Sequence, residues 1–351
     1  MKELTGAIHI HTKFSDGTKD VPEIIDIARE VGLDFLMFSD HHTLEPKRLG
    51  FEGWHGNLLV FIGYEINDKD DNNHYLAFNI EKELNNHLTP EEYVRIIKEK
   101  GGFGIIAHPD EQGSKIERFR TFPWKNWEIN GYSCIEIWNQ MSEWKEGLTK
   151  RNQLWKLLHP RKSLKGPKQI TLKRWDEINK IRKVGGIGGL DVHAVHYRLF
   201  KIFPVIIYRY KVHFKSIRTH VLIDDSLFKN NSLPAFEKVK VKFYHSLSSG
   251  RCFISNFALG DARNFRFLCE SGNNIVETGE DLIKNEGRIK FHCNLPLKGE
   301  VRLFKDSVLK DKKRGKEVSF SCDEPGIYRV EVYRKRKPWI YSNPIRVLKN
   351  E

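Results

Sequence analysis

Short apolar runs alternate with amphipathic stretches through the first two-thirds of the 351-residue chain. The runs predict strands and the stretches between them predict helices. The expected strands are 7–12, 35–39, 58–66, 74–79, 103–107, 134–138, 187–192 and 217–223. Repeated strand–helix units predict an α/β fold with a parallel sheet or barrel, whose site lies at the carboxyl ends of the strands.

Boundary residues support the predicted helices. Pro22 fits the first turn of one helix and Gly32 fits its end. Thr89 and Glu92 have the spacing of a capping box at the start of another helix. The expected helices are 22–31, 89–100, 172–184 and 235–249. Segment 194–231 shows no clear hydrophobic period except at 217–223, which is one of the expected strands.

The pattern of hydrophobic and turn-forming residues changes near residue 252. Short alternating runs follow, separated by Gly, Pro, Asn and Asp, and such spacing predicts an all-β sandwich-like domain. We therefore expect a barrel domain at 1–250 and a small β domain at 251–351. Trp339 and Tyr341 are expected to fill the core of this β domain or to pack on the barrel.

The formal charge of +13 favours anionic partners and would steer a phosphate-bearing substrate, with nucleic acid as a further possibility. A solvated lysine-rich surface explains the same charge. No apolar run is long enough to span a membrane, and no secretory signal precedes the first strand, so we expect a cytoplasmic protein without a membrane partner. Five dispersed cysteines predict reduced, mostly buried thiols rather than a zinc ribbon.

Pairs of metal-type ligands stand at the ends of two predicted strands. His9 and His11 are two residues apart, and alternation along a strand places both imidazoles on one face. Asp191 and His193 repeat the device at 187–192. Taken alone, an H-x-H pair is a weak indication of a metal site.

Further acids and histidines stand where other apolar runs end. Asp40, His41 and His42 follow 35–39, Glu65 ends 58–66, and His108 follows 103–107 directly; Asp16 lies in the loop after the first strand. Carboxyl ends of neighbouring strands meet at one edge of a sheet. We therefore expect these side chains to converge.

The ordered segments around these residues resemble the motif set of the PHP (polymerase and histidinol phosphatase) family over roughly residues 1–250. They read Ile-His9-Ile-His11-Thr, Ser-Asp16-Gly, Ser-Asp40-His41-His42, Gly-Tyr-Glu65, Ala-His108-Pro and Leu-Asp191-Val-His193. The resemblance implies a distorted (β/α)7 barrel that binds two to three divalent metal ions and hydrolyses phosphate esters. Residues after 250 resemble, more loosely, the β domain of some stand-alone members.

The resemblance also implies a ligand set. It assigns His9, His11, Glu65 and Asp191 to a first metal, with Glu65 bridging to a second metal held by His108 and His74. It assigns Asp16, His41 and His193 to a third metal. His74 has a structural or surface role as its alternative. Imidazole and carboxylate ligands suit Zn²⁺, Mn²⁺ or Fe²⁺ and do not separate these three.

A hydroxide bridging two metals would attack phosphorus, with Asp191, His193 and His42 at the catalytic centre and His42 near substrate. Four other residues are expected around the ligands. Asp40 and Glu136 are expected to orient ligand side chains, and Lys13 and Arg120 are candidate phosphate contacts or solvated charges.

Two other classes of function fit part of the pattern. An amidohydrolase-type hydrolase also begins with H-x-H, but a bridging lysine is expected there where this chain has Glu65. A metal-bound interaction module without activity is the second alternative. The substrate class expected for the phosphoesterase is a phosphorylated small molecule or a nucleotide.

Overall fold

The computed structural model describes residues 1–114, 120–199, 202–228, 233–284 and 288–349. The chain forms two compact units. The His-rich unit comprises Thr5–Lys165 and Gly188–Arg218, and the β-rich unit comprises Met1–Leu4, Gly166–Ile187 and Thr219–Glu351. The expected division into 1–250 and 251–351 stays a prediction.

The strands of the His-rich unit form a mixed sheet. They are β1 (Lys2–Ile10, shared with the β-rich unit), β2 (Phe35–His41), β3 (Gly53–His55), β4 (Leu58–Ile66), β5 (Tyr75–Phe78), β6 (Phe103–Ile106) and β7 (Cys134–Asn139). β2 pairs in parallel with β1 and β4, and β6 with β7, whereas β3 is antiparallel to β4. β5 is antiparallel to both β4 and β6, so the expectation of a purely parallel sheet is wrong.

The reversed direction of β5 decides which residues meet at one edge. Tyr75, at the start of β5, pairs with Ile66 at the end of β4 and with Ile106 at the end of β6. An antiparallel strand begins at the edge where its neighbours end. His74, which immediately precedes β5, therefore lies at the edge that carries the ends of β4 and β6.

The segment after β8 (Gly185–Gly189) returns to the end of β1. The amide of Leu190 donates to the carbonyl of Ile8 at 2.9 Å, and the amide of His11 donates to the carbonyl of Val192 at 3.1 Å. A parallel bridge joins Ile10 and Val192. Residues 190–193 thus run beside the chain that carries the first two histidines.

Two predicted helices of this unit are confirmed, and several short elements were not predicted. α1 (Val21–Glu30) and α3 (Pro90–Glu99) begin with capping boxes at Asp20 and Thr89. The unpredicted elements are α2 (Glu45–Arg48), α4 (Gln140–Lys145), α5 (Gln153–Leu158), η1 (Pro160–Ser163), β9 (His196–Leu199), β10 (Phe203–Ile206) and α7 (Tyr210–Phe214). Elements this short are below the length over which hydrophobic periodicity is readable.

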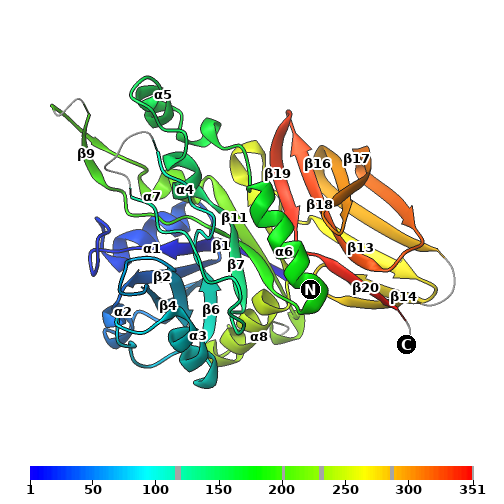
Figure 1. Ribbon diagram of the computed structural model, residues 1–351, viewed down its shortest axis with the longest axis horizontal. Helices are drawn as coiled ribbons and strands as arrows, with labels where there is room; N and C mark the ends of the chain where they lie inside the picture. Colours follow the sequence, from blue (N-terminus) through cyan, green and yellow to red (C-terminus); the bar gives the residue numbers. More distant parts are fainter. Residues whose placement is uncertain (115–119, 200–201, 229–232, 285–287, 350–351) are drawn as a thin grey trace. The chain divides into compact units, whose positions relative to one another are not determined.

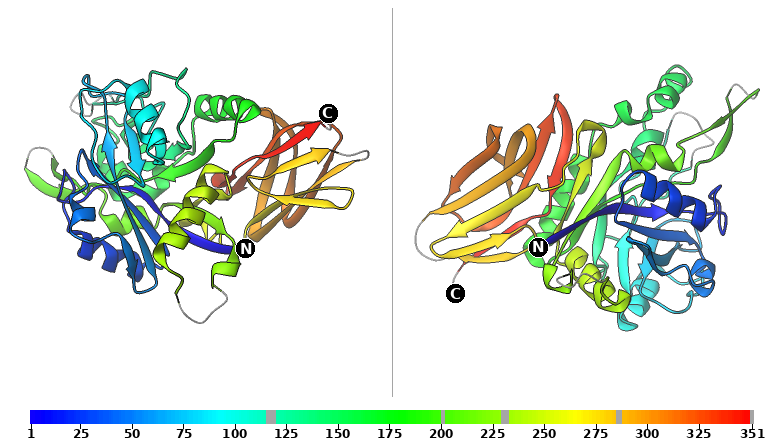
Figure 2. Two further views of the ribbon diagram at one scale, coloured as in Figure 1. Left: turned by 90° about the horizontal axis from the view of Figure 1, so that it is seen from below. Right: turned by 180° about the vertical axis from the view of Figure 1, so that it is seen from behind.

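The β-rich unit consists of long strands with two helices, α6 (Gln169–Ile181) and α8 (Phe236–Ser248). Its strands are β11 (Ile217–Ile223, shared with the His-rich unit), β12 (Cys252–Asn256), β13 (Arg266–Ser271), β14 (Asn274–Glu277), β15 (Asp281–Lys284), β16 (Ile289–Lys305), β17 (Val308–Cys322), β18 (Gly326–Arg334), β19 (Lys337–Ser342) and β20 (Ile345–Lys349). β16 is antiparallel to β13, β17 and β18 (Figures 1 and 2).

One apolar core lies inside the β-rich unit. Trp339 is fully buried there beside strand residues such as Phe291 and Val330. This confirms the expectation that Trp339 fills a core. The five cysteines are free thiols, four of them buried. Among the described residues, no helix has the length and apolarity that a bilayer crossing requires.

Candidate metal centre

A bulge in β1 directs the first two histidines into one cavity. The β1–β2 register slips between Ile8 and Ile10, which makes His9 the extra residue, and its φ is 69°. His11 lies just beyond the strand. Simple alternation is therefore not what brings the two rings together, although their centroids are only 5.0 Å apart. A bulge re-aims a side chain in this way.

Left-handed backbone is concentrated at this edge of the sheet. His9, His42, His108 and Asp191 have φ values of 69°, 52°, 26° and 54°. Such conformations are strained for residues with a side chain and persist only where surrounding contacts enforce them. Four strained residues from four strand ends indicate that the side chains are held for a purpose other than packing.

The carboxylate of Glu65 lies at the centre of the cluster and is 1% exposed. Five imidazole nitrogens lie 2.7–3.6 Å from its oxygens. They belong to His74 (2.7 Å), His9 (3.0 Å), His11 (3.3 Å), His108 (3.3 Å) and His41 (3.6 Å). The sequence expectation that these residues converge is thus met by the geometry.

Two further carboxylates complete the cluster. Asp191 Oδ1 lies 3.6 Å from Nε2 of both His9 and His11. Asp16 Oδ2 lies 3.2 Å from His193 Nε2 and 3.8 Å from His41 Nε2. Each acid therefore faces at least two imidazoles.

Ligand atoms in this cluster fall into four overlapping groups, each with all its atoms within 4.8 Å of one another. The groups are His9–Glu65–His108, His9–His11–Asp191, His41–Glu65–His74 and His11–Asp16–His41–His193. Glu65 and His11 each belong to two of these groups. Neighbouring metal ions would need such residues as bridging or adjacent ligands.

Buried nitrogens without partners show that the cluster is incomplete as a hydrogen-bonded network. Among the described residues, neither ring nitrogen of His11 has a hydrogen bond of acceptable geometry, nor has His74 Nε2 or His108 Nδ1, although His11 Nε2 lies 3.3 Å from Glu65 Oε2 and His74 Nε2 lies 3.5 Å from Asp71 Oδ1. Buried polar atoms are normally paired, because an unpaired one costs about 1–3 kcal/mol. Bound divalent metal ions would supply the missing partners, so these residues fit such ions, and their donor set suits Zn²⁺, Mn²⁺ or Fe²⁺.

The charges of the cluster are strongly coupled. Burial opposes ionisation of Glu65 and Asp191, but the imidazoles around them, His9 first, hold the pKa of both carboxyls well below its usual range. Burial likewise opposes protonation of His11 and His74, yet the neighbouring carboxylates raise the pKa of His11 to about 10 and of His74 to about 9. The carboxylates of the cluster therefore favour positive charge at this place.

Glu136, at the centre of β7, holds two of the ligand residues. Its Oε1 lies 2.8 Å from His9 Nδ1, and its Oε2 accepts the backbone N–H of His108 at 2.8 Å. These are the contacts that an orienting residue would make, and the orienting role of Glu136 stays a prediction. A Cβ at Gly189 would lie 1.8 Å from Glu136 Oε1, so only glycine leaves room for the carboxylate.

Asp40 bonds to the loop that follows β1. It accepts hydrogen bonds from Thr12 N–H (2.7 Å), Thr12 Oγ1 (2.8 Å) and Ser15 Oγ (2.7 Å), and not from an imidazole. Asp40 therefore fixes the loop that carries Asp16. The role expected for Asp40 in orienting a ligand imidazole stays a prediction, because its described contacts are to the loop residues Thr12 and Ser15.

The remaining predicted residues lie at the periphery. His42 is exposed and lines the cavity, with its ring 6.3 Å from that of His41. Lys13 is exposed and forms an ion pair with Asp20. Arg120 is also exposed, 3.4 Å from Asp71, which lines the cavity. Neither cation reaches a ligand carboxylate in the described contacts.

A cavity of about 430 Å³ opens over the cluster. Sequence reasoning missed one wall of it, formed by Phe122, Met141, Trp144, Lys145, Val195 and Ile207. Three of these residues, Met141, Trp144 and Lys145, belong to the six-residue helix α4, which is too short to be recognised from its hydrophobic period.

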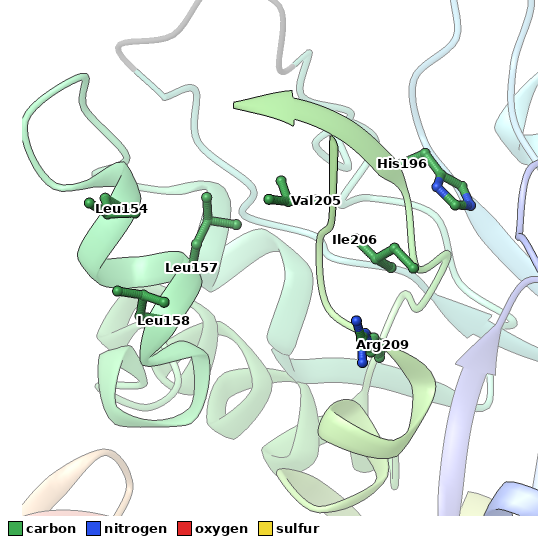
Figure 3. Close-up of a pocket in the computed structure, with 7 residues that line it drawn as sticks. All are labelled: Leu154, Leu157, Leu158, His196, Val205, Ile206 and Arg209. Atoms are coloured by element: carbon green, nitrogen blue, oxygen red, sulfur yellow. The ribbon is translucent and has the colours of Figure 1, made fainter. Parts of the chain in front are cut away.

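A second cavity of about 520 Å³ lies between α5 and the β9–β10 hairpin (Figure 3). Leu154, Leu157 and Leu158 face Val205 and Ile206 across it. His196 and Arg209 are its polar lining residues, and no carboxylate is among the described residues that line it. It therefore lacks the donor set that the first cavity has.

Comparison with known proteins gives sparse likenesses. No protein-family model matches the chain. MJ1587 of Methanocaldococcus jannaschii, described as uncharacterized, is 29% identical over 117 residues, which span 29% of this chain and 66% of that protein. The chain thus covers slightly less than two thirds of this relative.

Two solved structures are also similar. A two-domain protein from Bacteroides vulgatus, named as containing a predicted PHP-like metal-dependent phosphoesterase, has 15% identity and a TM-score of 0.43, covering 98% of this chain and 95% of that one. A candidate metal-dependent phosphoesterase from Bifidobacterium adolescentis has 16% identity and a TM-score of 0.31, covering 54% and 87%. Both neighbours are named as phosphoesterases. At these scores, the case for a metal centre here rests on its own residues.

Proposed function

We propose that the protein is a metal-dependent hydrolase of phosphate esters. The observation that carries this proposal is the buried Glu65 carboxylate, which five imidazole rings surround. Four nitrogen atoms of these rings form no hydrogen bond with a described residue. We further propose two to three Zn²⁺, Mn²⁺ or Fe²⁺ ions, a phosphorylated small molecule or nucleotide as substrate, and a cytoplasmic location.

The proposed architecture is a distorted (β/α)7 barrel at 1–250 followed by a β-sandwich domain at 251–351. Support for the barrel comes from the contiguous pairing of β1, β2, β4, β5, β6 and β7 and from the return of 190–192 to the end of β1. The long antiparallel pairs of β16 support the second domain.

In the proposed reaction, an oxygen of water forms a bond to phosphorus, the ester P–O bond breaks, and the alcohol leaves with a proton. The ligand groups would hold divalent metal ions, which when bound would supply a water of lowered pKa and charge neutralisation at the phosphoryl oxygens. Glu136 keeps His9 and the His108 backbone in place, and Asp40 keeps the Asp16 loop in place. Exposed His42 is positioned to exchange a proton with the leaving group at the mouth of the cavity.

The decisive experiment compares Glu65→Gln and His108→Ala with wild type after metal removal and reloading. Both variants should lose about 10³-fold in hydrolysis of p-nitrophenyl phosphate or bis-p-nitrophenyl phosphate, because metal chemistry contributes several kcal/mol to the barrier. His87→Ala and Glu99→Gln change exposed residues of the same kinds and should leave the rate unchanged. Circular dichroism checks that each variant is folded.

The alternative functions give different results in the same assays. A wild-type protein that binds metal but cleaves neither phosphate ester would favour the non-catalytic module. Cleavage of carboxylic amides instead of phosphate esters would favour the amidohydrolase. Phosphatase activity that survives Glu65→Gln would contradict the proposed site.

A further inference from the structure

A buried lysine lines the metal cavity. Lys145, the last residue of α4, has a side chain that is only 12% exposed, and its ammonium nitrogen lies 2.5 Å from Glu111 Oε1. The ring centroid of Phe122 lies 5.9 Å from the same nitrogen. Lysine is rarely buried without a reason in the surrounding structure. Because Lys145 lines the cavity, its ammonium group is placed to bind an anion there.

The hydrogen-bond inventory leaves this ammonium with capacity for a ligand. Lysine carries three N–H donors, and Glu111 is the acceptor that the described residues provide for it. Glu111 is itself fixed, because Ser142 Oγ donates to Oε1 at 2.8 Å and the Phe122 amide donates to Oε2 at 2.9 Å. The carboxylate therefore holds Lys145 without consuming its remaining donors.

Electrostatics keep Lys145 charged in this place. Burial alone favours the neutral amine, but the negative charge of Glu111, followed by that of Asp191 and Glu65, raises the pKa of Lys145 above its ordinary value. The two ligand carboxylates are thus within electrostatic reach of the ammonium. In the proposed metal-bound site, the Lys145 ammonium and the metal ions are positive charges that line one cavity. An anion that lies between them would be attracted by both.

A line of hydrogen bonds fixes the position of Lys145 relative to the ligands. Asn139 Oδ1 accepts the Ser142 N–H at 2.9 Å and caps α4, while Asn139 Nδ2 donates to Glu136 Oε2 at 2.8 Å. Glu136 in turn contacts His9, as described above. The ammonium and the first ligand imidazole therefore belong to one connected framework that begins at the end of β7.

We propose that Lys145 donates a hydrogen bond to a non-bridging oxygen of the substrate's phosphoryl group. The same wall carries the apolar side chains of Phe122, Met141, Trp144 and Ile207, so the esterified group is an aromatic or nucleobase-bearing alcohol rather than a small polyol. This inference rests on the proposed function. A purely structural Lys145–Glu111 pair would require neither the unused donors nor a place in the cavity wall.

The test is binding of inorganic phosphate to the metal-loaded protein by isothermal titration calorimetry. Lys145→Met should weaken phosphate binding about 10- to 100-fold, the usual effect of losing one charge-assisted hydrogen bond, with metal content unchanged. Lys145→Arg should recover part of the affinity. Lys150→Met, which changes an exposed lysine of the same unit, is the matched control and should bind as wild type.

A second variant keeps the test valid if Lys145→Met fails to fold because Glu111 is left unpaired. Lys145→Met combined with Glu111→Gln removes both charges, and it should show the same loss of phosphate affinity. Wild-type phosphate affinity in either folded variant overturns the inference. Metal-loaded wild type that binds phosphate but hydrolyses no ester would defeat the proposed function and leave this binding result standing.

The substrate class has its own measurement. The wild-type kcat/KM for benzyl phosphate should exceed that for glycerol 3-phosphate at least about tenfold, because both esters release an alkoxide of similar basicity and a buried aromatic ring gains a few kcal/mol from apolar contact. Ile207→Asn should reduce that ratio. Equal kcat/KM values for the two esters in wild type would overturn the assignment of the apolar wall.

Discussion

Each of the two units buries a cluster of charges, and the two clusters satisfy those charges in opposite ways. In the β-rich unit, Arg329 on β18 lies between Asp176 and Glu331, with donor–acceptor distances of 2.7–3.1 Å. Ser307 Oγ donates to Asp176 at 2.7 Å, and Tyr333 donates its hydroxyl to Glu331 at 3.2 Å. All three charged side chains are at most 2% exposed, and none of their polar atoms lacks a partner among the described residues.

The candidate metal centre of the His-rich unit also buries carboxylates, but no arginine lies between them among the residues that the structure describes. Its positive groups are imidazoles, several of whose nitrogens form no hydrogen bond with a described residue, and its backbone is strained at four strand ends. Burial of charge is therefore common to both clusters and does not by itself indicate function. Buried imidazole nitrogens that form no hydrogen bond with a described residue distinguish the candidate site from the structural network.

Breaking the arginine cluster tests the structural half of this comparison and should have the largest effect on stability. Arg329→Met leaves two carboxylates buried without their cation, and it should lower the free energy of unfolding by about 3–5 kcal/mol. Urea denaturation measures this loss. Metal content and phosphatase activity per folded protein should stay at wild-type values, because the cluster is built to be complete without ligand.

Two controls separate burial from charge in that experiment. Arg302→Met removes a half-buried arginine paired with Glu300, and it should cost less than about 1 kcal/mol. Replacing Asp176, Arg329 and Glu331 together by Leu, Met and Leu should recover most of the stability, since buried ion pairs often exchange for apolar groups without loss. A loss of metal binding in Arg329→Met would contradict a purely structural role.

Changing Glu136 tests the functional half and should produce a smaller effect. Glu136→Gln places an amide N–H₂ against the donors of His108 or Asn139, so the orientation of His9 is weakened. We expect metal affinity to fall about 10- to 100-fold, measured by competition with a chromophoric chelator. Glu99→Gln, which changes an exposed residue of α3, is the control. Equal affinities in the two variants would mean that Glu136 only anchors β7.

Much of this site could be predicted from sequence because its residues stand at the ends of readable apolar runs. Phe35–His41 and Leu58–Ile66 are continuous buried strands, and the acids and histidines follow them immediately. His74 was the least certain ligand, since its position depends on β5 running antiparallel. The direction of β5 depends on tertiary contacts and cannot be predicted from the residue pattern of one short strand.

The missed parts share a physical reason. Lys145 and its partner Glu111 lie in short or irregular segments, where no period is long enough to define a face. The bulge at His9 is equally invisible, because Ile8 and Ile10 alternate with histidines as an ordinary strand would. The contacts of Asp40 could not be predicted either, because a carboxylate bonds whichever donors fold closest, and here these are the hydroxyl groups of Thr12 and Ser15.

The pH dependence of metal binding is the smallest effect that should distinguish the two clusters. Metals require unprotonated imidazoles, whereas the carboxylates of the metal-free site raise the pKa of His11 to about 10 and of His74 to about 9. We therefore expect both rings to be protonated at pH 7 in the metal-free site and to release their protons when metal binds. The apparent metal affinity should then rise about tenfold per pH unit for each proton released between pH 6 and 8, or about 1.4 kcal/mol. Calorimetry in buffers of different ionisation enthalpy counts the protons, and His74→Gln should lower the count by about one; a heat of binding that is independent of the buffer would contradict the expected exchange of protons for metal.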